Sequence, residues 1–153
     1  MFIFVLLVYL FLYIMEKVKK ISKMILVVRK DLNMRKGKIA SQTAHAALKV
    51  ILDLGRYEPV YQSDDSTLVI PIEHGTALKD WLTGEFTKIC VSVNSEAELL
   101  RIYEASKKAG LMCSLIQDAG HTEFAGVPTY TCCAVGPNWS DEIDPITKDL
   151  SLL

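Results

Sequence analysis

Two short loops carry the residue types that could bind and cleave a polar substrate. The first runs from Asn33 to Lys38 and leads straight into a predicted helix. Its cations are Arg35, Lys36 and Lys38. A helix N-terminus offers unpaired N–H groups and a partial positive charge, so cations there oppose the helix unless they bind an anion. The spacing of a Walker loop is absent. The loop predicts phosphate binding, with a solvated basic loop as the alternative.

The second loop, Gln117–Thr122, follows a predicted strand and contains the acid Asp118. Ligands of α/β proteins bind outside the carboxyl ends of parallel strands. The Ala-Gly after Asp118 lets backbone or substrate approach closely. Asp118 is therefore a candidate site residue. The alternative is a plain turn in which Asp118 bonds its own backbone.

The histidines and cysteines show no metal-ligand spacing. The histidines are His45, His74 and His121, and the cysteines are Cys90, Cys113, Cys132 and Cys133, with no C-x-x-C pair. Adjacent Cys132 and Cys133 should point to opposite faces of one strand. We predict reduced core cysteines in a cytosolic protein, and no structural zinc.

The elements that must position these loops alternate between strand and helix. Strands are predicted over 24–28, 87–93, 113–117 and 130–135, and helices over 39–54, 76–82, 95–110 and 141–148. A capping box, Ser95-Glu-Ala-Glu98, starts the third helix. The stretch at about 56–77 is predicted to be an irregular insertion. Because no helix separates the last two strands, we expect a mixed, partly parallel sheet covered on both faces.

The charge of the chain is unevenly distributed, although the formal net charge is −1. Residues 17–38 contain nine basic residues and one acid, and residues 39–153 contain eight basic and 16 acidic residues. A local basic cluster can hold a phosphate backbone while acidic surfaces elsewhere keep the protein soluble. For residues 16–23, a solvated basic linker is the expected role.

The first 15 residues are hydrophobic and uncharged. As a helix, residues 2–15 would span roughly 21 Å, against a hydrocarbon core of about 30 Å. Lysines that follow could snorkel to the membrane surface and favour a cytosolic domain. We expect a short membrane anchor; the alternatives are an uncleaved targeting segment, or initiation at Met15 or Met24. A cleaved signal peptide fits less well, because no cleavage site follows.

Six motifs, in order along the chain, resemble those of the type II peptidyl-tRNA hydrolases of archaea and eukaryotes. They are Met24–Asp31, Lys36–Lys38, Gln42–Ala47, Asp118–Thr122, Val135–Pro137 and the ending Ile143–Leu153. The resemblance covers roughly 24–153. It implies a three-layer α/β/α domain with a four-stranded mixed sheet, and hydrolysis of peptidyl-tRNA without a metal or organic cofactor.

The same resemblance assigns roles to individual residues. The catalytic site would contain Lys38, Asp118, Thr122 and, as a fourth polar position, Thr131. The tRNA backbone would contact Arg35, where the family often has glycine, Lys36, and His121, where it often has Arg or Lys. His45 matches a helix histidine of the family that would support the site; a structural histidine between helix and sheet is the alternative.

In the expected reaction, Asp118 orients and deprotonates water, and Lys38 stabilises the oxyanion or the terminal phosphate. Thr122 positions the water or donates to the carbonyl oxygen. No partner base is evident that would make Thr122 a nucleophile. The competing hypothesis is a membrane-anchored, non-catalytic signalling adaptor. A third hypothesis, a generic RNA-binding module, is disfavoured because the sequence lacks the exposed aromatic platform on which such modules stack bases. The sequence leaves a homodimer open.

Overall fold

The computed structural model describes residues 20–153. The hydrophobic segment 1–15, expected to be a helical membrane anchor, lies outside the described residues, as does the first half of the basic linker predicted at 16–23. Within residues 20–153, no helix is both long and apolar enough to cross a membrane. The first strand, β1 (Ser22–Arg29), begins before the predicted domain boundary, so the last two residues of the predicted linker belong to the sheet.

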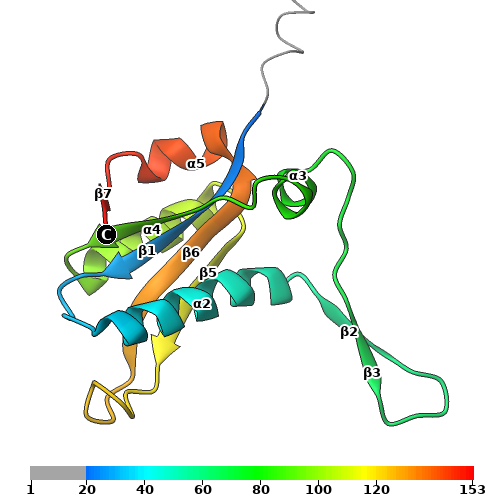
Figure 1. The fold of residues 1–153 in the computed structure, drawn as a ribbon, viewed down its shortest axis with the longest axis horizontal. Helices are drawn as coiled ribbons and strands as arrows, with labels where there is room; N and C mark the ends of the chain where they lie inside the picture. The colour runs from blue at the N-terminus through cyan, green and yellow to red at the C-terminus, as the bar shows by residue number, and fades with distance from the viewer. Residues whose placement is uncertain (1–19) are drawn as a thin grey trace, which may run out of the picture.

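A five-stranded mixed sheet lies at the centre of the described molecule (Figure 1). Its other strands are β4 (Lys88–Val93), β5 (Cys113–Asp118), β6 (Thr129–Trp139) and β7 (Ser151–Leu152). The strand order is β5-β6-β1-β4-β7. β1 pairs with β4 in parallel, whereas β6 runs antiparallel to both β1 and β5, and β7 antiparallel to β4.

The mixed sheet was predicted correctly, but its number of strands was not. The prediction of four strands is wrong because β7 adds a fifth at the edge of β4. This strand has only two residues. It is too short to show the alternation of polar and apolar residues from which strands are predicted.

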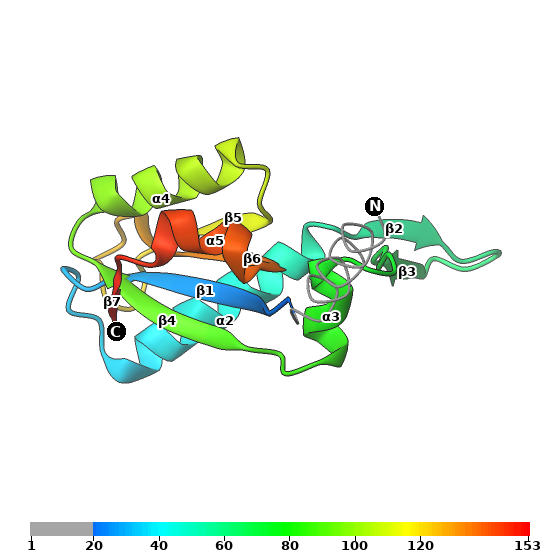
Figure 2. The ribbon, with the colours of Figure 1, turned by 90° about the horizontal axis from the view of Figure 1, so that it is seen from above.

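Four helices cover the two faces of the sheet within residues 20–153 (Figure 2). They are α2 (Lys36–Leu52), α3 (Ala77–Thr83), α4 (Glu96–Lys108) and α5 (Ser140–Thr147). On one face, Leu26 and its alternate neighbours pack with side chains of α2 and α3. On the other face, Val27 packs with side chains of α4 and α5. The layers are therefore helix, sheet and helix, because successive strand residues point to opposite faces.

The cysteines of β6 follow the same alternation. Cys132 belongs to the core on the α2 side and Cys133 to the core on the α4 side, as predicted. All four cysteines are free thiols. Burial raises the pKa of Cys132 to about 12, so it stays a neutral core thiol at physiological pH.

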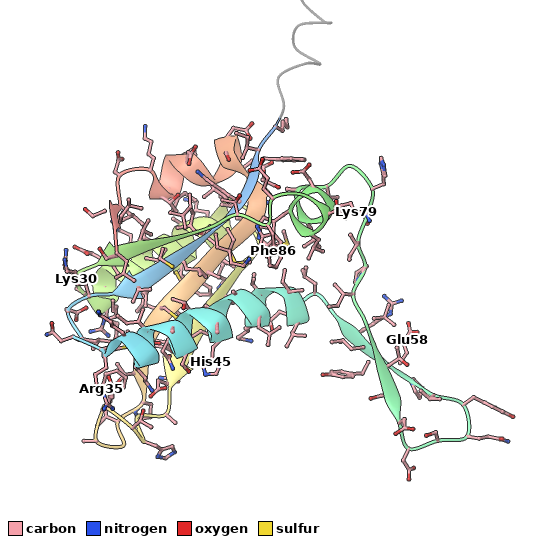
Figure 3. The ribbon with its side chains drawn as sticks, in the orientation of Figure 1. Lys30, Arg35, His45, Glu58, Lys79 and Phe86 are labelled. Carbon is pink, nitrogen blue, oxygen red and sulfur yellow. The ribbon has the colours of Figure 1, made fainter. Side chains whose placement is uncertain are left out.

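The insertion predicted to be irregular contains a β-hairpin. Its strands, β2 (Arg56–Pro59) and β3 (Ser66–Val69), pair only with each other and lie beside no other helix or strand of the described chain. Figure 3 shows Glu58 out on this hairpin, away from the layers. The prediction of an irregular segment is wrong here because strands of four residues, interrupted by Pro59 and a polar turn, resemble a loop in sequence.

Candidate active site

The residues predicted to form the site converge where β1 and β5 end. These two strands are parallel because both run antiparallel to β6, so their carboxyl ends meet at one edge of the sheet. α2 begins shortly after β1, and Asp118 is the last residue of β5. Between them lies a groove of about 570 Å³. We call it the Lys38 groove; its lining residues are Arg35, Gly37, Lys38, Ser41, Gln42, His45, Asp118, Thr122 and Glu123.

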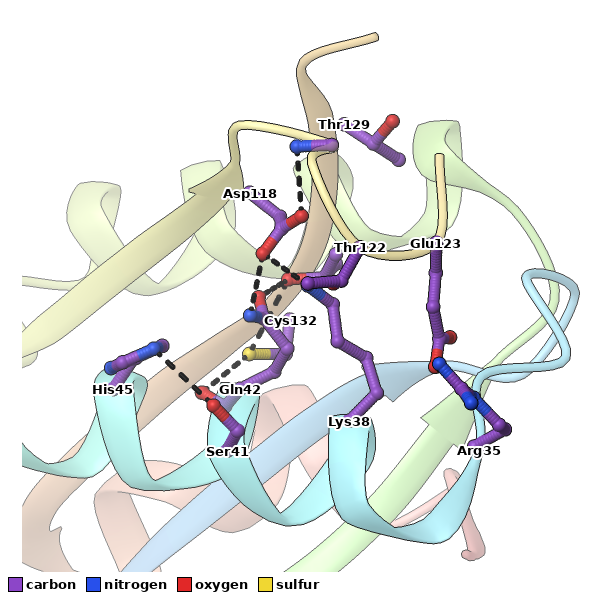
Figure 4. A network of polar contacts seen from close by, with 12 residues as sticks. Arg35, Lys38, Ser41, Gln42, His45, Asp118, Thr122, Glu123, Thr129 and Cys132 are labelled. Carbon is purple, nitrogen blue, oxygen red and sulfur yellow. Dashed lines mark hydrogen bonds and ion pairs between the residues drawn. The ribbon is translucent and has the colours of Figure 1, made fainter. Parts of the chain in front are cut away.

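Lys38 is the centre of the groove's polar contacts (Figure 4). Its Nζ donates to Asp118 Oδ2 at 2.5 Å and to Thr122 Oγ1 at 3.0 Å. The side chains of Lys38 and Asp118 are only 11% and 14% exposed. Lys38 also lies 5.5 Å from the centre of the Phe124 ring. Three of the four predicted catalytic residues are therefore in direct contact.

Asp118 is held in its charged form by donors on both of its oxygens. Oδ2 accepts from Lys38 and from Gln42 Nε2 at 2.9 Å, and Oδ1 accepts from the backbone N–H of Gly120 at 2.9 Å. Lys38 above all, and then the Gly120 N–H, hold the pKa of Asp118 below its usual value, against the effect of burial. The group is a stable carboxylate and a weakened proton acceptor.

Gly120 is required by the close packing of the loop after β5. Its φ is +84°, and a Cβ at this position would lie 2.5 Å from the Val127 carbonyl oxygen. A side chain would have to displace backbone here. The glycine thus allows the tight turn that aims the Gly120 N–H at Asp118.

Gln42 is a site residue to which sequence reasoning gave no role. It is buried on α2, and its Oε1 accepts from Thr131 Oγ1 at 2.5 Å while its Nε2 donates to Asp118. The carboxylate can only accept, so this pairing fixes the orientation of the amide. The available signal was spacing: Gln42 lies one turn after Lys38, on the same side of the helix.

Thr131 reaches Gln42 because of a β-bulge in β6. Ile116 and Gln117 are adjacent on β5, yet their partners on β6 are Cys132 and Tyr130. Thr131 is the extra residue between these partners, and its side chain joins that of Cys132 on the α2 side. Thr131 is fully buried and does not line the groove. Its contact with Gln42 suits it to hold that side chain in place, whereas the resemblance predicted a fourth polar residue of the catalytic site.

His45 lies on the wall of the Lys38 groove. Its side chain is exposed, and its Nε2 is 3.4 Å from Ser41 Oγ, one turn earlier on α2. The alternative of a structural histidine packed between helix and sheet is wrong, because α2 turns this position toward solvent. Ser41 was not singled out from the sequence.

The predicted tRNA contacts lie around the mouth of the groove. Arg35 is 79% exposed and donates from Nε to Glu123 Oε1 at 2.7 Å. Lys36 is the exposed first residue of α2, and His121 is exposed on the loop after β5; neither lines the groove. α2 has no side-chain cap and no acid in its first turn. The start of the helix is thus left electropositive, as the basic loop predicted.

No group of three or more His, Cys, Asp and Glu side chains that could hold a metal ion occurs among residues 20–153. The groove is instead lined by cations, carboxylates, hydroxyls and an imidazole. Such groups can orient water, transfer protons and stabilise a developing oxyanion.

Comparison with known proteins identifies the family. A family model described as peptidyl-tRNA hydrolase PTH2 matches residues 22–153. The chain belongs to the PTH2 family. The peptidyl-tRNA hydrolase of Methanocaldococcus jannaschii is 40% identical over 131 residues, which cover 86% of this chain and 99% of that protein. That of Sulfurisphaera tokodaii is 40% identical over 132 residues, covering 86% and 98%. That of Methanothermobacter thermautotrophicus is 39% identical over 132 residues, covering 86% and 99%.

The PTH2 match confirms the resemblance drawn from the six motifs. It begins at Ser22, where β1 begins. The relatives are hydrolases by name, and these comparisons give no support to the alternative of a membrane-anchored adaptor.

Proposed function

We propose that this PTH2 protein hydrolyses the ester bond of peptidyl-tRNA, releasing free tRNA and peptide. The observation that carries the proposal is the joining of Lys38, Asp118 and Thr122 in one groove by bonds of 2.5 and 3.0 Å. These residues come from parts of the chain about 80 positions apart. Named relatives that match almost their whole length support the same reaction.

Lys38 is suited to stabilise the tetrahedral intermediate. An ammonium group has three N–H donors. Two of them are directed to Asp118 and Thr122. The third is available to the carbonyl oxygen of the substrate, on which negative charge develops. A donor pre-aligned in this way typically raises the rate by about 10²- to 10³-fold.

Thr122 and Asp118 are suited to hold the attacking water. Thr122 Oγ1 accepts from Lys38, so its own O–H is free to donate. Asp118 Oδ1 accepts only the Gly120 N–H among the contacts of the described residues, which leaves it room for a second donor. Asp118 in this role orients the nucleophile, and its lowered pKa keeps it charged over the physiological range.

The mouth of the groove is suited to the phosphates of the tRNA end. Arg35 and Lys36 stand at the start of α2, whose first N–H groups have no side-chain cap. His121 lies on the facing loop. The arginine side of the Arg35–Glu123 pair is 79% exposed, which leaves the guanidinium accessible to a phosphate. No observation on the described residues favours a homodimer or a membrane contact, and neither is part of this proposal.

The test is release of a labelled N-blocked amino acid from its tRNA by residues 20–153 and by the full chain. Lys38→Ala and Asp118→Asn should each lower kcat/KM by about 10²- to 10⁴-fold. Lys49→Ala is the matched control, because Lys49 lies on the same helix and pairs with Asp53 outside the groove. Losses under about threefold in both groove variants, or a comparable loss in the control, would contradict the proposal.

A further inference from the structure

The Lys38 groove contains five titratable side chains, and four of them are paired. Lys38 pairs with Asp118, and Arg35 pairs with Glu123. The fifth, His45, forms no ion pair among the described residues, and its recorded partner is the hydroxyl of Ser41 at 3.4 Å. That distance is long for a hydrogen bond. His45 is therefore a lightly held imidazole on the wall of the proposed catalytic groove.

The reaction needs a proton acceptor that the paired residues do not supply well. Asp118 already accepts three hydrogen bonds, two of them on the oxygen next to Lys38. These donors stabilise the carboxylate and make it a poor acceptor of a further proton. Efficient general bases have a proton affinity near the working pH, and imidazole is the side chain that ordinarily meets this condition.

The position of His45 on α2 matches this need. Lys38, Gln42 and His45 are separated by four and three residues, so they lie on one side of the helix. Figure 4 shows His45 and Ser41 on the same helix as Lys38, below Asp118. All three helix residues line the groove. A substrate lying along the groove would pass Lys38 and His45 in turn.

We propose that His45 is the general base of this site, taking the proton from a water that Asp118 and Thr122 orient. This assignment rests on the proposed function. The water oxygen forms a bond to the ester carbonyl carbon as its O–H bond breaks, and the proton goes to His45. The carbonyl electron pair moves onto the oxygen, which Lys38 stabilises. When the intermediate collapses, the bond to the ribose oxygen breaks and that oxygen takes the proton back from His45.

The charged groups around His45 allow the pH dependence to be interpreted. Those that line the groove with His45 are Lys38 on α2, Arg35 just before it, Asp118 at the end of β5 and Glu123 on the facing loop. Lys49 lies one turn further along α2 and pairs with Asp53, and His121 lies on the facing loop outside the groove lining. Asp118 has a pKa below its ordinary value, which is near 4. Its protonation therefore cannot cause a loss of activity between pH 5 and 7, where imidazoles titrate.

The experiment is a pH–rate profile of kcat from pH 5 to 9 for the wild type, His45→Gln and His45→Ala. The wild type should lose activity toward the acid end of this range, as the general base becomes protonated. His45→Gln should lower kcat at pH 7.5 by about 100-fold, change KM by less than about threefold and abolish the acid limb. Added imidazole should restore part of the activity of His45→Ala. His74→Gln, an exposed histidine outside the groove, should behave as wild type.

The outcomes separate this assignment from the proposed function. Turnover by the wild type that collapses in Lys38→Ala and Asp118→Asn, with His45→Gln near full activity or with an unchanged acid limb, overturns the role of His45 alone. No turnover by a folded wild type overturns the proposed function. Loss of kcat with loss of the limb, together with imidazole rescue, supports His45 as the base.

Discussion

At the scale of single residues, Gln42 is the link between the protein interior and the groove. Its amide accepts from buried Thr131 and donates to Asp118, which in turn accepts from Lys38. Every polar group in this series of hydrogen bonds has a partner, and no buried side-chain N or O atom of the described residues is left without one. The orientation of Asp118 is thus set from below by Gln42, which the buried Thr131 holds in place.

Replacing Thr131 with Val should therefore reduce activity from a distance. Valine keeps the shape but removes the donor to Gln42 Oε1, which leaves a buried oxygen unpaired at a cost of about 1–3 kcal/mol. We expect Tm to fall by several degrees and kcat by roughly tenfold, with little change in KM. Thr131→Ser keeps the hydroxyl and should restore kcat. Equal kcat in the Val and Ser variants would contradict the positioning role.

The sequence predicted the proposed catalytic residues of the groove better than the residues that support them. Lys38, Asp118 and Thr122 were predicted from motifs, and the structure brings them together. Strict strand alternation would place Thr131 opposite Cys132, on the α4 side. The bulge in β6 places it on the α2 side instead, and nothing in the local residue types marks a bulge. Gln42 was missed because a single amide in a helix is usually a surface residue.

At the scale of elements, the regular helices and strands were predictable because each has a long apolar stripe or a clear start. α4 begins at the predicted capping Ser95, whose Oγ accepts from the Glu98 N–H. α2 begins three residues earlier than predicted, at Lys36, because apolar periodicity starts only at Ile39. The earlier start matters, since it brings Lys36 and Lys38 into the first turn.

The β2–β3 hairpin should be dispensable for catalysis. Arg56 and Val69 are paired across its base, so a two- or three-residue Gly-Ser turn can replace residues 56–69. Because its strands lie beside no other helix or strand described, the shortened protein should keep kcat/KM within about threefold and a cooperative thermal transition. Both are measured by the release assay and by calorimetry. A fall of tenfold or more with an intact fold would show that the hairpin contacts substrate.

At the scale of the whole molecule, binding of tRNA has to overcome a slightly negative formal charge of −1. The acidic excess lies after residue 38, and the start of α2 keeps the basic cluster at the mouth of the groove. Such separation lets a small cluster dominate the encounter with a polyanion, since charges beyond about 8–10 Å are screened at physiological salt.

The double variant Arg35→Ala, Lys36→Ala should therefore bind tRNA with a weaker dependence on salt. Each lost phosphate contact lowers the slope of log K against log salt by about 0.7–0.9. Affinity measured from 50 to 200 mM salt should show a slope shallower by about one to two units. Lys107→Ala, Lys108→Ala, at the end of α4, is the control with the same charge change. Identical slopes for the two double variants would rule out the assigned contacts.

The two-residue strand β7 has a consequence for how the molecule meets copies of itself. It pairs with Val91 and Ser92, and the Leu153 N–H donates to the Cys90 carbonyl. An open sheet edge is a template for strands of other chains, and such pairing leads to aggregation. The last residues of the chain therefore protect β4 from intermolecular β-pairing. A tag fused after Leu153 that displaced β7 would expose the edge of β4, and we expect such a fusion to be less soluble.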